Sequence, residues 1–316
     1  MEPPVNEAAA FIARRVEGAM QTGRPAGPYT TYRLGGPAAI SVEPAGEEDL
    51  AVVAAAMQTF GLDCLILGKG SNVLISDEGF PGIVVKLGAA FEWMNRDQDE
   101  VAAGGAAPLP KLANLAARNA LTGLEFAVAI PATVGGAVRM NAGAHGASMS
   151  DVLTDARIYR LNRAEAQTIT AADLEMKYRS TSLGPGEIVV SARFHLAQAS
   201  PEEIRERMAR YRRHRTETQP SDAPNAGSVF RNPRGKSAGG LIESAGLKGH
   251  RLGGAQISSK HANFFVAHPG ATAQDVYDLI RLAQQEVRDR FGIVLEPEVR
   301  TAGKFSGGPL LGSHGP

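Results

Sequence analysis

The segment Leu67-Gly68-Lys69-Gly70-Ser71-Asn72 constrains the fold of this chain most strongly. It follows the apolar residues 65–67, so the pattern predicts a strand that runs into a glycine turn. Backbone N–H groups in such a turn can form an anion-binding concavity, so the turn predicts either a phosphate cradle or a plain hairpin. A P-loop is excluded because Gly70 stands where that motif needs a hydroxyl residue. A Rossmann fingerprint is excluded because Val73 stands where a third glycine is needed.

A second segment, residues 225–233, places Ser228 directly after Gly227 and before an apolar pair. Its pattern is typical of a serine that a loop presents for proton transfer. The two segments lie far apart in the sequence, so the fold has to bring a phosphate-binding loop and a reactive group together. A chain of 316 residues is long enough for two or three domains, and we expect an enzyme with at least two.

Composition excludes several classes of protein. Lys plus Arg and Asp plus Glu both total 33, and a net charge of zero disfavours a nucleic-acid partner. The single cysteine, Cys64, cannot form an internal disulfide; we expect it to be a small core residue in a reducing compartment. No apolar run approaches the roughly 20 residues of a membrane span, and the N-terminus lacks the pattern of a signal peptide. We therefore expect a cytoplasmic protein without a membrane partner. We also expect a monomer.

Hydrophobic periodicity and capping residues predict a mixed α/β chain. The expected helices cover residues 7–20 (with Asn6 as N-cap), 47–60, 110–120, a segment from 201 onward, and 273–291. The expected strands cover residues 65–67, 73–75, 83–85, 158–161, 187–196 and 293–295. Residues 303–316 are rich in Gly, Pro and Ser, so we expect a disordered tail.

Residues 123–146 are apolar and dense in glycine and alanine. Small residues allow backbone to approach another group closely. A tight crossing of strands is one interpretation of this stretch, and a bound flat ligand is the other.

The order of these motifs resembles the UDP-N-acetylenolpyruvoylglucosamine reductases. The likeness extends over residues 29–300 and is carried by residues 31–38, 68–74, 123–136, 140–143, 178–180, 227–233, 238–249, 259–264 and 295–300. It implies an α+β fold: a vanillyl-alcohol-oxidase-like FAD-binding domain in two α/β subdomains (residues 1–90 and 91–215) and a C-terminal α/β substrate-binding domain (216–302), with the tail at 303–316. The chain lacks a long tyrosine-bearing insertion between Arg179 and Asn225, so it is similar to the shorter type in this family.

The resemblance implies reduction of the enolpyruvyl ether of UDP-N-acetylglucosamine to UDP-N-acetylmuramate for peptidoglycan synthesis. NADPH is the implied hydride donor, and non-covalent FAD passes the hydride from its N5 to the substrate. An FAD-dependent hydroxy-acid oxidase is an alternative that shares the cofactor domain, and a flavin- or UDP-sugar-binding protein without catalysis is another.

The same resemblance implies the roles of individual residues. Ser228 matches the proton donor, Arg179 the group that polarises the substrate carboxylate, and Glu298 the partner that stabilises the enolic intermediate. Glu296 would share a face with Glu298 on a strand, so the choice between them rests on the family pattern. The residues that the resemblance implies for binding the cofactor are Tyr32, Arg33, Gly68, Lys69, Gly70, Ser71, Asn72, Ile130, Pro131, Thr133, Gly135, Gly136, Asn141, Ala142 and Gly143. Those that it implies for binding the substrate are Tyr178, Asn232, Lys248, His261 and Asn263. No metal is expected.

Some positions are open or depart from the family pattern. Lys236, Lys248 and Arg251 are candidates for binding the diphosphate of the substrate. The family usually has glycine where Ala129 and Ala132 stand, which predicts a slightly altered fit to the cofactor.

Overall fold

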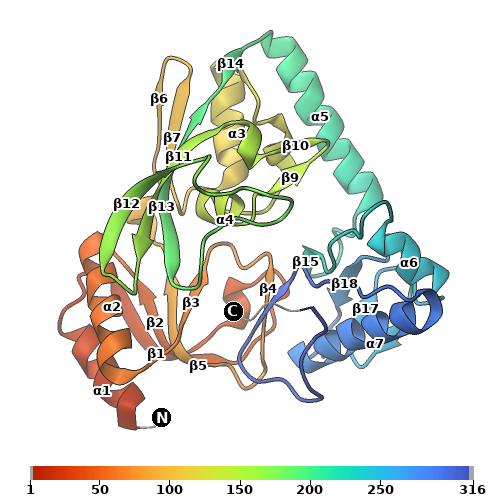
Figure 1. The fold of residues 1–316 in the computed structure, drawn as a ribbon, viewed down its shortest axis with the longest axis horizontal. Coiled ribbons are helices and arrows are strands. Elements are labelled where there is room, and N and C mark those ends of the chain that lie inside the picture. The colour runs from red at the N-terminus through yellow and green to blue at the C-terminus, as the bar shows by residue number, and fades with distance from the viewer. Residues whose placement is uncertain (1–2, 313–316) are drawn as a thin grey trace. The chain divides into compact units, whose positions relative to one another are not determined.

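The computed structural model describes residues 3–312 and divides the chain into two compact units. The first unit comprises residues 1–22, 39–69 and 82–215, and the second comprises residues 23–38, 70–81 and 216–316. Each unit contains both helices and strands, as the mixed pattern predicted (Figure 1).

The first unit contains a four-stranded sheet in the order β1-β2-β5-β3, in which β3 and β5 are parallel. Its core includes Ile40, Leu50 and Val53, which are completely buried. The helix α2 begins with an acidic turn and ends at Gly61, whose φ of 63° suits glycine at a helix C-terminus. Cys64 packs against this core as a small apolar residue, and burial raises the pKa of its thiol to about 12. The elements are α1 (Pro3–Ala13), β1 (Ala19–Pro25), β2 (Pro37–Glu43), α2 (Glu47–Phe60), β3 (Cys64–Leu67) and β5 (Phe80–Lys86).

A second sheet in the same unit is antiparallel, with the order β12-β11-β13-β7-β6 (Figure 1). Its core includes Leu112, Phe126 and Phe194, each at most 2% exposed. The strands of this sheet are β6 (Met94–Asp97), β7 (Glu100–Gly104), β11 (Leu153–Arg160), β12 (Glu165–Thr170) and β13 (Glu187–His195). The short strands β8 (Leu121–Thr122) and β14 (Ala197–Gln198) form one separate pair, and β9 (Gly143–Ala144) and β10 (Ala147–Ser148) form another. The helices in this part of the chain are α3 (Leu109–Arg118), α4 (Val134–Arg139) and α5 (Pro201–Thr218).

The second unit has an antiparallel sheet in the order β15-β18-β17-β16, and α7 packs against it. Thr272 and Asp275 form a capping box that begins α7 at Ala273, the residue at which the sequence predicted this helix to begin. A separate parallel pair joins β4 to β19, with Val73 opposite Arg300. The elements are β4 (Val73–Ile75), β15 (Asn225–Ser228), α6 (Ala238–Ser244), β16 (Arg251–Leu252), β17 (Ala255–Ile257), β18 (Phe264–Ala267), α7 (Ala273–Phe291) and β19 (Arg300–Ala302).

Most of the expected elements are confirmed, but two are wrong. The first helix ends at Ala13 instead of residue 20, because the backbone N–H groups of Glu17 and Gly18 donate to the carboxylate of Asp49 and Ala19 begins β1. Asn6 lies inside this helix and is not its N-cap. Residues 293–295 are not a strand; the backbone C=O of Leu295 instead accepts a hydrogen bond from the side chain of Gln284.

The division into units coincides with the expected boundary between residues 215 and 216. It differs within the first expected FAD subdomain, because residues 23–38 and 70–81 group with the C-terminal residues. The parallel pairing of β4 with β19 and the burial of Tyr32 among C-terminal residues explain this grouping. Within residues 3–312, no helix combines the length and the apolar character that crossing a membrane requires.

Residues 303–312 do not form the free tail that their composition predicted; residues 313–316 lie outside the described part. The ring of Phe305 stacks on Tyr277 with a centroid distance of 4.4 Å, and Leu310 is 5% exposed. The Tyr277 hydroxyl donates to the C=O of Gly308 at 2.8 Å. An aromatic and an aliphatic anchor therefore hold a segment that is otherwise rich in glycine.

Gln284 on α7 links this C-terminal segment to the core. Its side chain is 1% exposed, donates to the C=O groups of Leu295 and Leu311, and accepts from the N–H of Leu311.

Gln284→Ala should lower the free energy of unfolding by about 2–4 kcal/mol, because buried backbone groups lose their partners and a cavity opens. Chemical denaturation measures this loss. The exposed neighbour Gln285 provides the matched control Gln285→Ala; equal stability of the two variants would contradict the role of Gln284.

Candidate active site

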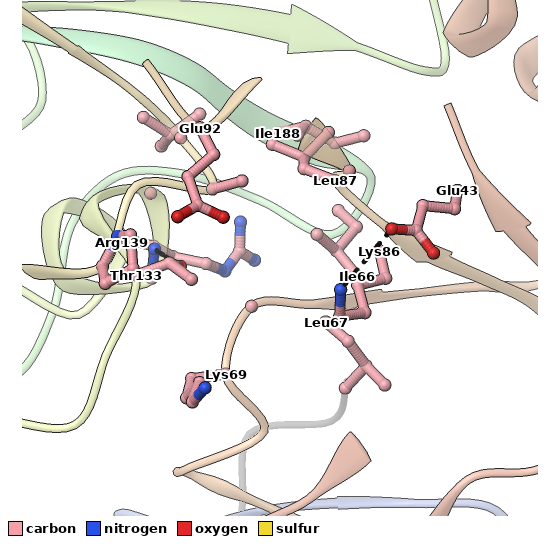
Figure 2. Close-up of a pocket in the computed structure, with 18 of the residues that line it drawn as sticks. Glu43, Ile66, Leu67, Lys69, Lys86, Leu87, Glu92, Thr133, Arg139 and Ile188 are labelled. Carbon is pink, nitrogen blue, oxygen red and sulfur yellow. Dashed lines mark hydrogen bonds and ion pairs between the residues drawn. The ribbon is translucent and has the colours of Figure 1, made fainter. Parts of the chain in front are cut away.

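A cavity of about 310 Å³ lies in the first unit, within the range of small-ligand pockets. Apolar side chains of Leu67, Leu87 and Ile188 line one part of it. Charged side chains and small residues also line it, and in Figure 2 Lys86 points toward Glu43, with 3.9 Å between Nζ and Oε1. The cavity therefore offers both an apolar slot and charged groups.

Five residues that the sequence assigned to a cofactor line this cavity: Gly68, Lys69, Thr133, Gly135 and Gly136. Gly68 follows the last residue of β3, and a Cβ there would lie 2.6 Å from Oγ1 of Thr133. A Cβ at Gly135 would lie 2.9 Å from the C=O of Val189 and 3.0 Å from that of Gly105. Glycine is needed at both positions, because a side chain would displace the walls of the cavity.

Among the many glycine and alanine residues of the stretch 123–146, Gly135 lies where two backbone segments approach each other closely. The N–H of Gly135 donates to the C=O of Gly105, and Pro108 pairs with Thr133 across an isolated antiparallel bridge. Two backbone segments therefore approach closely at Gly135, but they are α4 and the residue that follows β7, so this contact is not the crossing of strands that was one of the two interpretations. Gly136 lies at the cavity, where a ligand remains a prediction.

Sequence reasoning missed Gly105 and Arg139, which also line the cavity. Arg139 donates to the backbone C=O groups of Glu187 and Gly184, both at 3.0 Å, and Figure 2 shows its guanidinium group on the side of Glu92. The run of small residues at 102–107, where β7 ends, was the signal that could have indicated Gly105.

The other expected cofactor residues of the first unit do not line this cavity. Ile130 is partly buried and Pro131 is exposed. Asn141 is 5% exposed, and its Nδ2 donates to the C=O of Lys177 at 3.0 Å. Asn141 thereby supports the turn that carries Arg179. Ala142 and Gly143 follow it, and Gly143 begins β9.

Arg179 occupies the turn between Lys177 and Ser180 with a φ of 55°, a conformation that few residues other than glycine adopt. Its Nη2 donates to the C=O of Gly143 at 2.8 Å, and its guanidinium carbon lies 5.0 Å from the ring centroid of Tyr178. Tyr178 is 55% exposed. The turn therefore presents a cation beside an accessible aromatic ring.

The second unit places Ser228 and Glu298 on neighbouring backbone segments. Ser228 ends β15 opposite Phe264, and the N–H of Glu298 donates to the C=O of Val229 at 2.7 Å. Both residues are partly buried. The pairing thus brings together two of the three expected catalytic residues, and Arg179 belongs to the first unit.

A bulge in β15 sets the position of Ser228. The pairing with β18 is irregular between Asn225 and Ser228, where Gly227 has a φ of 75°. The side chain of Asn225 accepts from the N–H of Gly227 at 3.0 Å and donates to the C=O of Ala223 at 2.9 Å. Such a bulge re-aims the side chain that follows it.

The expected substrate residues of the second unit have defined partners. Asn263 is 3% exposed, and its side chain both accepts from the N–H and donates to the C=O of Phe230, which favours a role in holding that loop. His261 accepts from the N–H of Asn263 through Nδ1, and burial lowers its pKa, consistent with a neutral ring. Asn232 accepts from the N–H of Ala238, and Lys248 forms a 2.8 Å ion pair with Glu243.

The expected cofactor residues of the second unit are Tyr32, Arg33, Gly70, Ser71 and Asn72. Tyr32 is 1% exposed in the core of this unit, and burial raises the pKa of its hydroxyl. A Cβ at Gly70 would collide with the C=O of Tyr29, and Gly70 has a φ of 64°. The glycine turn therefore depends on Gly70 for its shape.

Comparison with known proteins first defines a class. Residues 38–165 match a family model described as an FAD binding domain, and the cavity-lining glycines and Thr133 fall within that match. A cavity with an apolar slot, cations and two glycines that exclude a Cβ suits a cofactor with flat rings and a diphosphate. The chain is thus a flavoprotein of the class whose FAD-binding domain the sequence predicted.

The second part of the chain narrows the class to a family. Residues 219–302 match the model of the C-terminal domain of UDP-N-acetylenolpyruvoylglucosamine reductase. A relative from Bacillus cereus, UDP-N-acetylenolpyruvoylglucosamine reductase 1, is 41% identical over 307 residues, covering 96% of this chain and all of the relative. A UDP-N-acetylenolpyruvoylglucosamine reductase from a Synechococcus species is 42% identical over 299 residues, with 94% and 95% covered.

A solved structure agrees with these relatives. The crystal structure of UDP-N-acetylenolpyruvylglucosamine reductase from Thermus caldophilus has a TM-score of 0.78 and 36% identity, and the match covers 91% of this chain and 99% of that one. The chain belongs to the UDP-N-acetylenolpyruvoylglucosamine reductase family. The predicted family is therefore confirmed.

Proposed function

We propose that this protein reduces the enolpyruvyl ether of UDP-N-acetylglucosamine to UDP-N-acetylmuramate, a precursor of peptidoglycan, with NADPH as reductant and FAD as cofactor. The observation that carries the proposal is the 41% identity along 307 residues to a relative named for this reductase. FAD, when bound, would supply the redox chemistry, the transfer of a hydride equivalent from NADPH to the β-carbon of the enol ether.

The chain's own residues supply binding, charge stabilisation and the proton. Arg179 holds the substrate carboxylate, for which a planar guanidinium group is suited. Glu298, with its carboxyl group protonated, donates a hydrogen bond to this carboxylate and so stabilises the negative charge that develops as the β-carbon takes up the hydride. Ser228 then gives its hydroxyl proton to the α-carbon, which completes the saturated lactyl ether, and a proton from water restores the serine hydroxyl.

The proposed FAD contacts are the cavity-lining Gly68, Lys69, Thr133, Gly135 and Gly136. The remaining residues that the family pattern assigns to the cofactor are part of the same proposal, including Gly70 and Asn72 of the glycine turn. The substrate is assigned to Tyr178, Asn232, Lys248 and His261, and we propose that the chain acts as a cytoplasmic monomer.

The test follows the colour of the flavin. The purified protein should be yellow, lose its colour with NADPH under anaerobic conditions, and regain it when the UDP-enolpyruvyl sugar is added. Recovery of colour only in air would favour the hydroxy-acid oxidase. A protein that takes up no FAD would contradict every flavin-dependent function, including this one.

A further inference from the structure

Both peptide groups that flank the Cα atom of Glu298 are held by hydrogen bonds within the second unit. The N–H of Glu298 donates to the C=O of Val229 at 2.7 Å. The C=O of Glu298 accepts from Nδ2 of Asn72 at 3.0 Å, and this contact is partly buried. With both peptide groups held, the direction of the Cα–Cβ bond of Glu298 is fixed.

Asn72 is itself held at both of its polar ends. Its backbone C=O accepts from the N–H of Arg300 at 3.0 Å, and its side-chain amide donates to the C=O of Glu298. The next residue, Val73, begins β4, which pairs in parallel with β19 opposite Arg300. The end of the glycine turn and the segment that carries Glu298 therefore run side by side.

The turn before Asn72 is anchored through a carbonyl group. The C=O of Gly70 accepts from the N–H of Thr31 at 3.0 Å and from its hydroxyl at 3.3 Å. The backbone N–H groups of Gly70, Ser71 and Asn72 donate to no acceptor among residues 3–312. This leaves three consecutive donors for an anion, the arrangement of a nest.

We propose that Asn72 is a positioning residue that ties the phosphate-binding turn to the backbone of Glu298. Its backbone N–H serves the diphosphate, while its side-chain amide holds the carbonyl group of Glu298. Ordering of the turn by the cofactor thereby orders the segment that carries the proposed enolate-stabilising carboxyl group. This inference rests on the proposed function and goes beyond it, because it gives Asn72 a role toward the reacting end of the substrate.

Hydrogen exchange of the apoprotein, with and without FAD, measures this coupling directly. In the wild type, FAD should slow exchange of the amides of Glu298, Val299 and Arg300 by about tenfold, since ordering a hydrogen-bonded segment raises its local stability. In Asn72→Ala the slowing should fall below about twofold. Equal slowing in the two proteins, at saturating FAD, would overturn the inference.

The two half-reactions give a second readout. In Asn72→Ala, which keeps the backbone N–H proposed for the diphosphate, substrate-dependent reoxidation should slow by about tenfold more than reduction by NADPH does. The reason is that loss of one hydrogen bond is worth about 1 kcal/mol and misplacement of Glu298 adds to it. Asn72→Leu keeps a similar shape, removes the donor without adding a charge beside the diphosphate, and should show the same split; it also carries the test if the alanine variant fails to fold. Asn119→Ala is the matched control, since it loses a side-chain bond to the C=O of Leu115 away from both sites.

Failure of the inference and failure of the proposed function give different results. If the wild type takes up FAD and the sugar nucleotide reoxidises it, but both half-reactions of Asn72→Ala fall equally or neither changes, only the role of Asn72 is wrong. If the sugar nucleotide does not reoxidise the wild-type flavin, the proposed function is wrong, and the hydrogen-exchange experiment with FAD alone still decides the coupling.

Discussion

Ser228→Ala should leave reduction of the bound flavin by NADPH within about twofold of wild type and slow its reoxidation by the UDP-enolpyruvyl sugar by about 10²- to 10⁴-fold, the range typical of general acid catalysis. The reason is that the serine hydroxyl supplies the proton to the α-carbon, a step that belongs only to the second half-reaction. Anaerobic stopped-flow absorbance of the flavin measures the two half-reactions separately.

Ser191→Ala is the matched control for this variant. Ser191 is another partly buried serine on a strand, β13, and it does not line the cavity. Its variant should retain both half-reactions. An equal loss of both half-reactions in Ser228→Ala would show that Ser228 acts in folding or in NADPH binding and not as the proton donor.

Gly105→Ala should cost the protein both stability and flavin. Gly105 is buried in the cavity wall, where an added Cβ would collide with the C=O of Val189 and lie 3.0 Å from Cδ1 of Leu87. The backbone of β13 cannot yield without breaking its hydrogen bonds, so we expect about 1–3 kcal/mol of lost stability, as for overpacked cores. The shifted wall should also weaken FAD binding by about tenfold or more, since about 1.4 kcal/mol corresponds to tenfold.

Urea denaturation and flavin-fluorescence titration measure the two effects of Gly105→Ala. Gly240→Ala is the control, because Gly240 is exposed on α6 and an added Cβ meets only the side chain of Ser237 at ordinary contact distance. Alanine favours a helix over glycine, so this control should be neutral or more stable by up to about 1 kcal/mol. Wild-type affinity for FAD in Gly105→Ala would contradict the assignment of this cavity to the cofactor.

Elements whose ends depend on residues close by in the sequence were predicted correctly, and elements that depend on residues far away in the sequence were not. The helices α2 and α7 were predicted with their bounds, because acidic first turns, a capping box and terminal glycines act within a few residues. The first helix was predicted too long because its end is set by hydrogen bonds from Glu17 and Gly18 to Asp49, more than thirty residues away. The expected strand at residues 293–295 failed because Gln284 takes the carbonyl group of Leu295.

The sequence by itself determined the family, the flavin class and the residue types of the proposed chemistry, because these depend on the identity and order of short motifs around Gly68, Ser228 and Glu298. Tertiary structure decided which of these motifs share a unit: the chain passes from one unit to the other between Lys69 and Gly70, so the second half of the glycine turn groups with the segment of Glu298. No local pattern encodes that grouping, because it arises from the pairing of β4 with β19 across more than two hundred residues. The side-chain amides of Asn72 and Asn263 likewise form hydrogen bonds with backbone groups that are distant in the sequence and that only folding brings within reach.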